Sequence, residues 1–141
     1  GSHRFEARTG HHLPPAPLTD GGDVFGHLGT DFTLLCIGTS EANARVFSEA
    51  AAALSVPLKM VALASGQGAD RYEAKWVLVR PDDFVAWTSQ EETVSPQTAA
   101  WVLARASANA NPEMMVNIID FSFDFISFNA FQIIKKKQIE F

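Results

Sequence analysis

Apolar and polar positions follow two different periods along the first half of the chain. Asp31–Ile37 is a short apolar run bounded by Gly29 and Gly38, which is typical of a buried strand. The next stretch, Glu41–Leu54, carries apolar residues at helical spacing, with Thr39 or Ser40 available as its N-cap. Its apolar face is formed by Ala44, Phe47, Ala51 and Leu54. Pro57 ends the helical unit, and a second apolar strand is predicted over Leu58–Leu63.

The second half of the chain predicts a hairpin followed by a helix. Two apolar runs, Lys75–Arg80 and Phe84–Thr88, flank Pro81-Asp82-Asp83, and this composition favours a tight turn with Pro81 at its first corner. Ser95 is a predicted N-cap, and the helix that begins at Pro96 is expected to reach about Ser107. Its apolar face is predicted to contain Ala99, Val102, Leu103 and Ala106.

The order of these elements predicts an α/β fold. A strand, a helix and a strand of these lengths form one right-handed crossover between parallel strands. The hairpin and the last helix then complete a mixed sheet of about four strands flanked by helices. Short helical turns are also expected over Asp23–Leu28 and in the loop Ser65–Asp70. This order of elements matches the thioredoxin fold, so we predict a thioredoxin-like domain.

Four segments are predicted along the chain. Residues 1–3 are interpreted as the remnant of an expression tag, and residues 4–29 as an extended arm laid over a surface. Three prolines exclude a helix in the arm: Pro14, Pro15 and Pro17. Residues 30–108 form the predicted thioredoxin-like domain. Residues 109–141 are an atypical tail, in which Phe, Ile, Asn and Lys replace the Leu, Gly and Arg of the body, so that a native and a non-native origin are both open.

Self-association is predicted to occur mainly through the tail. Its phenylalanines are Phe121, Phe123, Phe125, Phe128 and Phe131, and the first three alternate with polar residues as in a strand. A domain of this size has limited surface with which to cover them, so we expect a homo-oligomer with tail residues in the contact.

Composition and charge exclude several function classes. The 141 residues contain 47% hydrophobic and 19% charged residues, which is typical of a globular domain. A formal net charge of −5 argues against nucleic acid as a partner. The single cysteine excludes an internal disulfide and a metal site built on several thiolates. We expect a cytoplasmic protein with no membrane partner.

Cysteine chemistry is not expected either. A thioredoxin-like oxidoreductase needs a Cys-x-x-Cys motif at the start of the first helix, where the helix dipole lowers the pKa of a thiol. Here the loop Gly38–Glu41 contains no cysteine. Cys36 lies within a predicted strand, where a cysteine is usually a small buried apolar residue. The predicted domain therefore lacks the redox site of that fold.

No other polar group predicts a catalytic, cofactor-binding or metal-ligating residue. His11 and His12 point to opposite sides of an extended chain, and neither they nor His27 have acidic neighbours at ligand spacing. The segment Gly66-Gln67-Gly68 lacks the third glycine and the lysine of a phosphate-binding loop. Two acidic pairs are interpreted as solvated turns: Asp82 with Asp83, and Glu91 with Glu92.

The three tryptophans are interpreted as packing residues of a core or an interface. Trp76 and Trp87 lie on the predicted hairpin, and Trp101 lies on the last helix. We expect Trp87 to be buried together with Leu78 and Trp101.

Three motifs resemble the C-terminal domain of FAD-dependent aromatic-ring hydroxylases. Residues 10–14, Gly-His-His-Leu-Pro, resemble a Gly-x-Arg-x-Pro motif, with His12 in place of the usual arginine. Residues 25–35 resemble an Asp-Leu-x-Gly…Phe-Thr-Leu-Leu run, although the aspartate is replaced. Residues 80–87 contain Arg-Pro-Asp-x-x-Val-Ala-Trp, followed by Thr88 where an arginine is common. The resemblance covers roughly residues 10–106.

The resemblance implies an accessory domain that is not catalytic by itself. In that family, FAD and the substrate are bound by domains ahead of this one, and the parent enzyme uses NAD(P)H and oxygen to hydroxylate an aromatic ring. The expected partners are therefore the catalytic domains of a parent monooxygenase, and in some members of the family the domain takes part in dimer contacts. Two alternatives remain open: a stand-alone, redox-inactive thioredoxin-like binding module, and a small enzyme with an unrecognised site.

Overall fold

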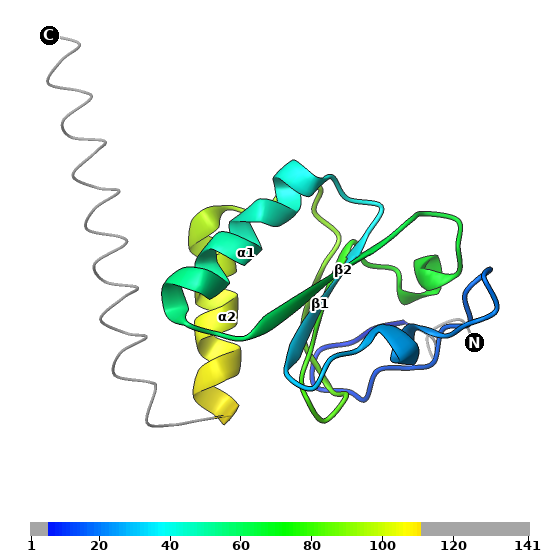
Figure 1. The fold of residues 1–141 in the computed structure, drawn as a ribbon, viewed down its shortest axis with the longest axis horizontal. Coiled ribbons are helices and arrows are strands. Elements are labelled where there is room, and N and C mark those ends of the chain that lie inside the picture. Colours follow the sequence, from blue (N-terminus) through cyan, green and yellow to red (C-terminus); the bar gives the residue numbers. More distant parts are fainter. Residues whose placement is uncertain (1–5, 111–141) are drawn as a thin grey trace, which may run out of the picture.

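Two helices and an arm enclose a small sheet in this protein. A computed structural model describes residues 6–110, with side chains through residue 108. The strands are β1 (Phe32–Ile37), β2 (Leu58–Leu63), β3 (Trp76–Val79) and β4 (Val85–Ser89). The helices are α1 (Glu41–Leu54) and α2 (Pro96–Ala110), together with the short 3₁₀ helices η2 (Val24–His27) and η3 (Ala69–Tyr72). In Figure 1, α1 and α2 lie on one side of the sheet, whereas the arm and both 3₁₀ helices lie on the other.

The sheet has the strand order β2-β1-β3-β4. β1 and β2 are parallel, with Phe32 opposite Leu58, and the remaining pairs are antiparallel. This arrangement confirms the predicted α/β class with a mixed four-stranded sheet and helices packed on it. α1 and β2 have the predicted bounds, whereas β1, β3 and β4 differ from prediction by one residue at one or both ends.

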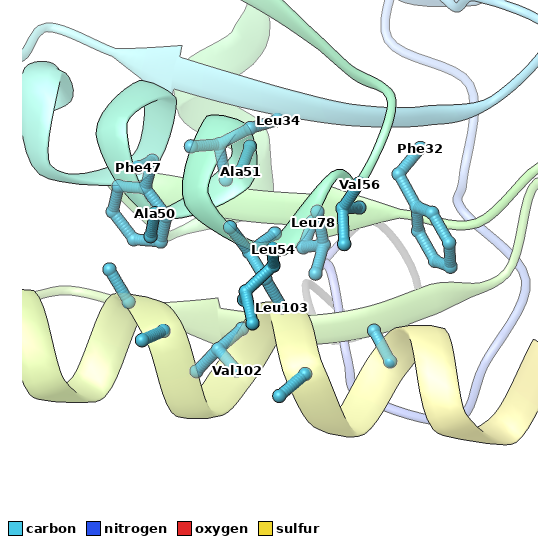
Figure 2. Packing of buried hydrophobic residues seen from close by; sticks show 14 of the residues in the cluster. Phe32, Leu34, Phe47, Ala50, Ala51, Leu54, Val56, Leu78, Val102 and Leu103 are labelled. Atoms are coloured by element: carbon cyan, nitrogen blue, oxygen red, sulfur yellow. The ribbon is translucent and has the colours of Figure 1, made fainter. Parts of the chain in front are cut away.

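The alternation of side chains along the strands creates two cores. On one face of the sheet, Leu34 and Cys36 of β1 join Leu78 of β3 and pack against α1 and α2. Figure 2 shows how Leu34, Leu78, Leu54 of α1 and Leu103 of α2 meet between the sheet and the helices. The intervening residues of β1 face the opposite side. All six residues of β1 are buried, as expected for a central strand covered on both faces.

Both long helices begin at the predicted caps. The hydroxyl oxygen of Ser40 accepts a hydrogen bond from the Asn43 N–H at 3.1 Å, and the hydroxyl oxygen of Ser95 accepts one from the Thr98 N–H at 3.1 Å. Each bond satisfies an N–H that has no partner within the helix. The predicted apolar face of α2 is buried. The helix extends to Ala110, beyond the predicted end near Ser107.

The arm covers the second face of the sheet. Ala7, Leu13 and Ala16 are buried there beside Tyr72 of η3 and the outward-facing residues of β1 and β3. The Tyr72 hydroxyl donates a hydrogen bond to the Pro14 carbonyl at 2.6 Å, which ties the arm to η3. The extended segment is therefore part of the packed body of the molecule.

The hairpin between β3 and β4 contains the predicted turn. The Asp83 N–H donates to the Arg80 carbonyl at 2.9 Å, which places Pro81 at the first corner, and Asp83 adopts a left-handed φ of 68°. An irregularity in the pairing follows, with Leu78 opposite Trp87 and Val79 opposite Val85. The inserted residue allows Val85 to pack with the arm while Trp87 packs toward the helices.

One packing prediction is wrong. Trp101 is 58% exposed and does not pack with Trp87 and Leu78 in the core. On a helix with 3.6 residues per turn, Trp101 lies about 160° around from Leu103, which is near the middle of the buried face. The residue therefore points away from the sheet. The predictions for residues 111–141, including the strand pattern of Phe121–Phe125 and self-association through the tail, lie outside the described residues.

Candidate functional site

The arm and the hairpin are joined by backbone hydrogen bonds at the start of β4. The Gly10 N–H donates to the Val85 carbonyl, the Val85 N–H donates to the His11 carbonyl, and the Leu13 N–H donates to the Asp83 carbonyl, each at 2.8 Å. Two of the sequence motifs described above, residues 10–14 and 80–87, are therefore neighbours in space. Together they cover the outer edge of the sheet at the beginning of its last strand.

A cleft of about 460 Å³ lies between this junction and α2. We call it the α2 cleft. It is lined by Thr9 and Gly10 of the arm, by Arg80, Val85, Ala86 and Trp87 of the hairpin, and by Thr98, Trp101, Val102, Arg105 and Ala106 of α2.

The two tryptophans of the α2 cleft have different roles. Trp87 is half-buried, and its ring lies 5.8 Å from the ring of Phe47, which is fully buried under α1. Trp87 is thus held by the core and forms a fixed wall of the cleft. Trp101 projects from α2 and is the most exposed large hydrophobic side chain among residues 6–108. Because it is not needed to fill the core, its apolar surface is available to a partner.

The charge of the α2 cleft is positive, although the chain as a whole is negative. Arg80 bonds Asp82 at 2.6 Å, and its guanidinium carbon lies 5.7 Å from the centre of the Phe84 ring. Arg105 is exposed and forms no ion pair with any described residue. Among the described residues, none that lines the cleft is acidic. A carboxylate is therefore the complementary group for this surface.

A second, polar cleft of about 560 Å³ lies near the carboxyl end of β1 and is lined by Ile37, Ser65, Asp70, Glu73, Ala74, Lys75 and Gln90. Two of its polar side chains bond to the protein itself. Lys75 pairs with Glu92 at 2.7 Å, and the Gln90 side-chain amide donates to the Glu73 carbonyl at 2.8 Å. These internal bonds leave Lys75 and Gln90 with little capacity to recognise a ligand.

Cys36 is buried, as predicted. It is 4% exposed within the helix-side core, and burial raises the pKa of its thiol to about 12. A thiol with so high a pKa is protonated near neutral pH and is a poor nucleophile. The loop Gly38–Glu41, where an oxidoreductase would place its cysteines, instead supplies the cap of α1.

The three histidines of the arm differ in exposure. His11 and His12 are exposed, and the His12 ring packs edge-on against Phe84 at 5.4 Å, whereas His27 is half-buried. Within residues 6–110, no three His, Cys, Asp or Glu side chains are grouped as metal ligands would be.

The glycine segment at residues 66–68 does not fit a dinucleotide. The Gly66 N–H is taken by the carboxylate of Asp70. A Cβ atom on Gly68 would lie 2.3 Å from the Pro17 carbonyl oxygen, so glycine is required there by close packing against the arm. The Gly66 N–H is therefore not free to bind a phosphate oxygen, and Gly68 is explained by packing against the arm.

The α2 cleft was not predicted from the sequence. Its signal is present on the exposed side of α2, where Trp101 and Arg105 are four residues apart and therefore share one face of the helix. The contribution of the arm could not be read in the same way, because it depends on contacts between distant segments.

Comparison with known proteins identifies one family. The family model described as "Aromatic-ring hydroxylase, C-terminal" matches residues 6–110. Among solved structures, the rebeccamycin biosynthetic enzyme RebC with reduced flavin is 31% identical with a TM-score of 0.61, over 72% of this chain and 19% of that one. The flavin-dependent monooxygenase PieE, in complex with FAD and substrate, is 27% identical with a TM-score of 0.61, over 73% and 20%.

A third solved structure, the ternary complex of aklavinone-11 hydroxylase with FAD and aklavinone, is 26% identical with a TM-score of 0.53, over 70% of this chain and 20% of that one. No curated protein sequence matches the chain. The chain thus spans about one fifth of the length of these solved relatives. Among the described residues, no helix is long and apolar enough to cross a membrane.

Proposed function

The chain belongs to the family of aromatic-ring hydroxylase C-terminal domains, and on that basis we propose that it is the accessory domain of a flavin-dependent monooxygenase. The observation that carries this proposal is the family match over residues 6–110, which includes the arm, the sheet and both long helices. The domain is proposed to be structural: it packs on the catalytic part of a parent enzyme and does not perform the chemistry.

The similar structures support FAD as the cofactor of the parent enzyme. PieE and aklavinone-11 hydroxylase were each solved with FAD, and RebC was solved with reduced flavin. As the resemblance implies, we place the flavin in the part of the parent enzyme that precedes residue 6. There the flavin would supply the redox chemistry of ring hydroxylation, and NAD(P)H would be the reductant.

The geometry is consistent with a scaffold role. The order of elements is the one expected of a thioredoxin-like fold, yet the one cysteine is buried and the loop before α1 serves as a helix cap. Both faces of the sheet are covered, by the helices and by the arm. What remains for contact with another domain is the outer surface, where the α2 cleft combines the exposed Trp101 with Arg105, which forms no ion pair with any other described residue. Homo-oligomer formation and a cytoplasmic location stay predictions.

The test of the proposed function begins with the DNA that encodes the chain. We expect a reading frame upstream, continuous with the chain or beside it, that encodes a Gly-x-Gly-x-x-Gly fingerprint after a strand. The protein expressed with that region should be yellow and should consume NAD(P)H when an aromatic substrate is added. The 141-residue chain alone should be colourless after gel filtration. A gene context without any flavin-binding region would favour the stand-alone binding module instead.

A further inference from the structure

We propose that the α2 cleft is the surface on which the catalytic part of the parent hydroxylase docks, and that the docking segment presents an apolar side chain beside a carboxylate. This inference rests on the proposed function, because it assigns a location to a contact that the proposed function requires. Its central residues are Trp101 and Arg105 on α2, with Trp87 as the fixed wall.

The first argument is the exposure of Trp101. A 58% exposed tryptophan contributes little to folding, since about half of its apolar surface remains in water. Its two neighbours in the sequence are buried: Ala100 is 5% exposed and Val102 is 8% exposed. Tryptophan and arginine are also the residue types that carry most binding energy at protein interfaces, above all when they lie beside a concave surface.

The second argument is charge. Arg105 has no ion pair among the described residues, and Arg80 at the other side of the cleft is held in place by Asp82. Asp82 neutralises Arg80, whereas no described carboxylate neutralises Arg105. A guanidinium group binds a carboxylate through two parallel hydrogen bonds, and burial of that pair beside an apolar contact gives both affinity and a fixed orientation.

The third argument identifies the occupant. Thr9 and Gly10 line the cleft, and the family match begins at residue 6. In a C-terminal domain the catalytic part is attached ahead of that residue. The arm first bonds η3 through the Ala7 N–H and then reaches the cleft at Thr9. Such a tether raises the effective concentration of the catalytic part at this surface, an advantage that a second copy of the chain or an unrelated protein does not have.

The experiment uses the parent enzyme divided into two proteins. The catalytic part encoded ahead of the chain is purified separately and titrated into the fluorescently labelled 141-residue chain, with dissociation constants measured by anisotropy. Four versions of the chain are compared: the native chain, Trp101→Ser, Arg105→Glu and the control Arg45→Glu. Arg45 is exposed on α1 and lies outside the α2 cleft, so its substitution makes the same change of charge at another surface.

We expect Trp101→Ser and Arg105→Glu each to weaken docking about tenfold or more, and Arg45→Glu to leave it unchanged. The native affinity should fall with added salt, and Arg105→Glu should lose most of that dependence. Because both cleft residues are exposed, thermal melts should show that the variants fold as the native chain does.

The outcomes separate the two proposals. If the native chain docks and the cleft variants dock equally well, the inference is overturned while the proposed function stands. If the native chain does not dock at all, both are overturned. Sedimentation of each version alone identifies the remaining outcome: self-association that is lost in Trp101→Ser, without docking of the catalytic part, would assign the cleft to a second copy and reject the inference.

Discussion

The buried thiol of Cys36 makes the stability of this fold decrease at alkaline pH. Burial raises the pKa of Cys36 from 9.0 to about 12, so the folded state keeps the proton that the unfolded chain releases. The contribution is fully present below about pH 9 and is lost as the pH rises toward about 12. The pKa of Tyr72 is also raised, mainly by burial and then by the charge of Asp23. Its contribution to stability is therefore lost from about pH 10 upward.

The variant Cys36→Ala tests this dependence. Its free energy of unfolding should be compared with that of the native chain by urea titration at about pH 8 and about pH 10.5. The stability advantage of the native chain should shrink at the higher pH, by at most about 2 kcal/mol. Tyr72 is present in both proteins, so its contribution cancels. Two curves that stay parallel across this range would contradict the burial of the Cys36 thiol in the folded state.

At the residue scale, the two tryptophans of the α2 cleft should differ in how much they contribute to the stability of the fold. Trp87→Ala should destabilise the fold by about 3 kcal/mol, the lower end for a buried tryptophan, because the ring packs on Phe47 and the helix-side core. Trp101→Ala should change the stability by less than about 0.5 kcal/mol, since its side chain is exposed. Chemical denaturation of the two variants measures this contrast, and equal losses would place Trp101 in the core.

At the scale of the element, only one of two neighbouring hydroxyl groups stabilises the start of α1. Ser40 caps the helix, whereas the hydroxyl oxygen of the neighbouring Thr39 is buried and has no hydrogen-bond partner among the described residues. Ser40→Ala should therefore cost about 1 kcal/mol of stability. Thr39→Val, which keeps the shape and removes the unpaired hydroxyl, should be neutral or stabilising. Melting temperatures of the two variants report the difference. A larger loss in Thr39→Val would show that Thr39 holds the loop.

The bounds of an element were predictable from the sequence where a capping residue or a proline marks its end, and were less predictable elsewhere. Ser40 and Pro57 mark the limits of α1 and β2, and both elements have the predicted bounds. The irregular pairing after Leu78 was not predictable, because it depends on the left-handed backbone of Asp83 and on how the arm meets β4. The exposed position of Trp101 could have been derived from helical periodicity alone. The cleft beside it could not, since the arm comes from a distant part of the chain.

At the scale of the whole molecule, the sheet is stabilised by two different coverings. One face packs on two regular helices. The other packs on an arm whose own regular structure is limited to the short η2, so that its order depends on burial and on bonds to β4 and η3. A segment of this kind cannot be stable apart from the sheet, because it has few backbone hydrogen bonds of its own. The arm, the hairpin and η3 should therefore unfold together with the helices.

Leu13 tests whether the arm belongs to this cooperative unit. Its side chain is fully buried on the arm side of the sheet, and its backbone N–H bonds the Asp83 carbonyl at 2.8 Å. Leu13→Ala should lower the free energy of unfolding by about 2–5 kcal/mol while the transition stays single and its urea dependence is unchanged. Pro15→Ala, at an exposed arm position, is the control. If the arm were only laid on the surface, Leu13→Ala would release it in a separate early step, and the main transition, followed by tryptophan fluorescence, would keep its midpoint. The buried position of Leu13 between β4 and η3 favours the single, shifted transition.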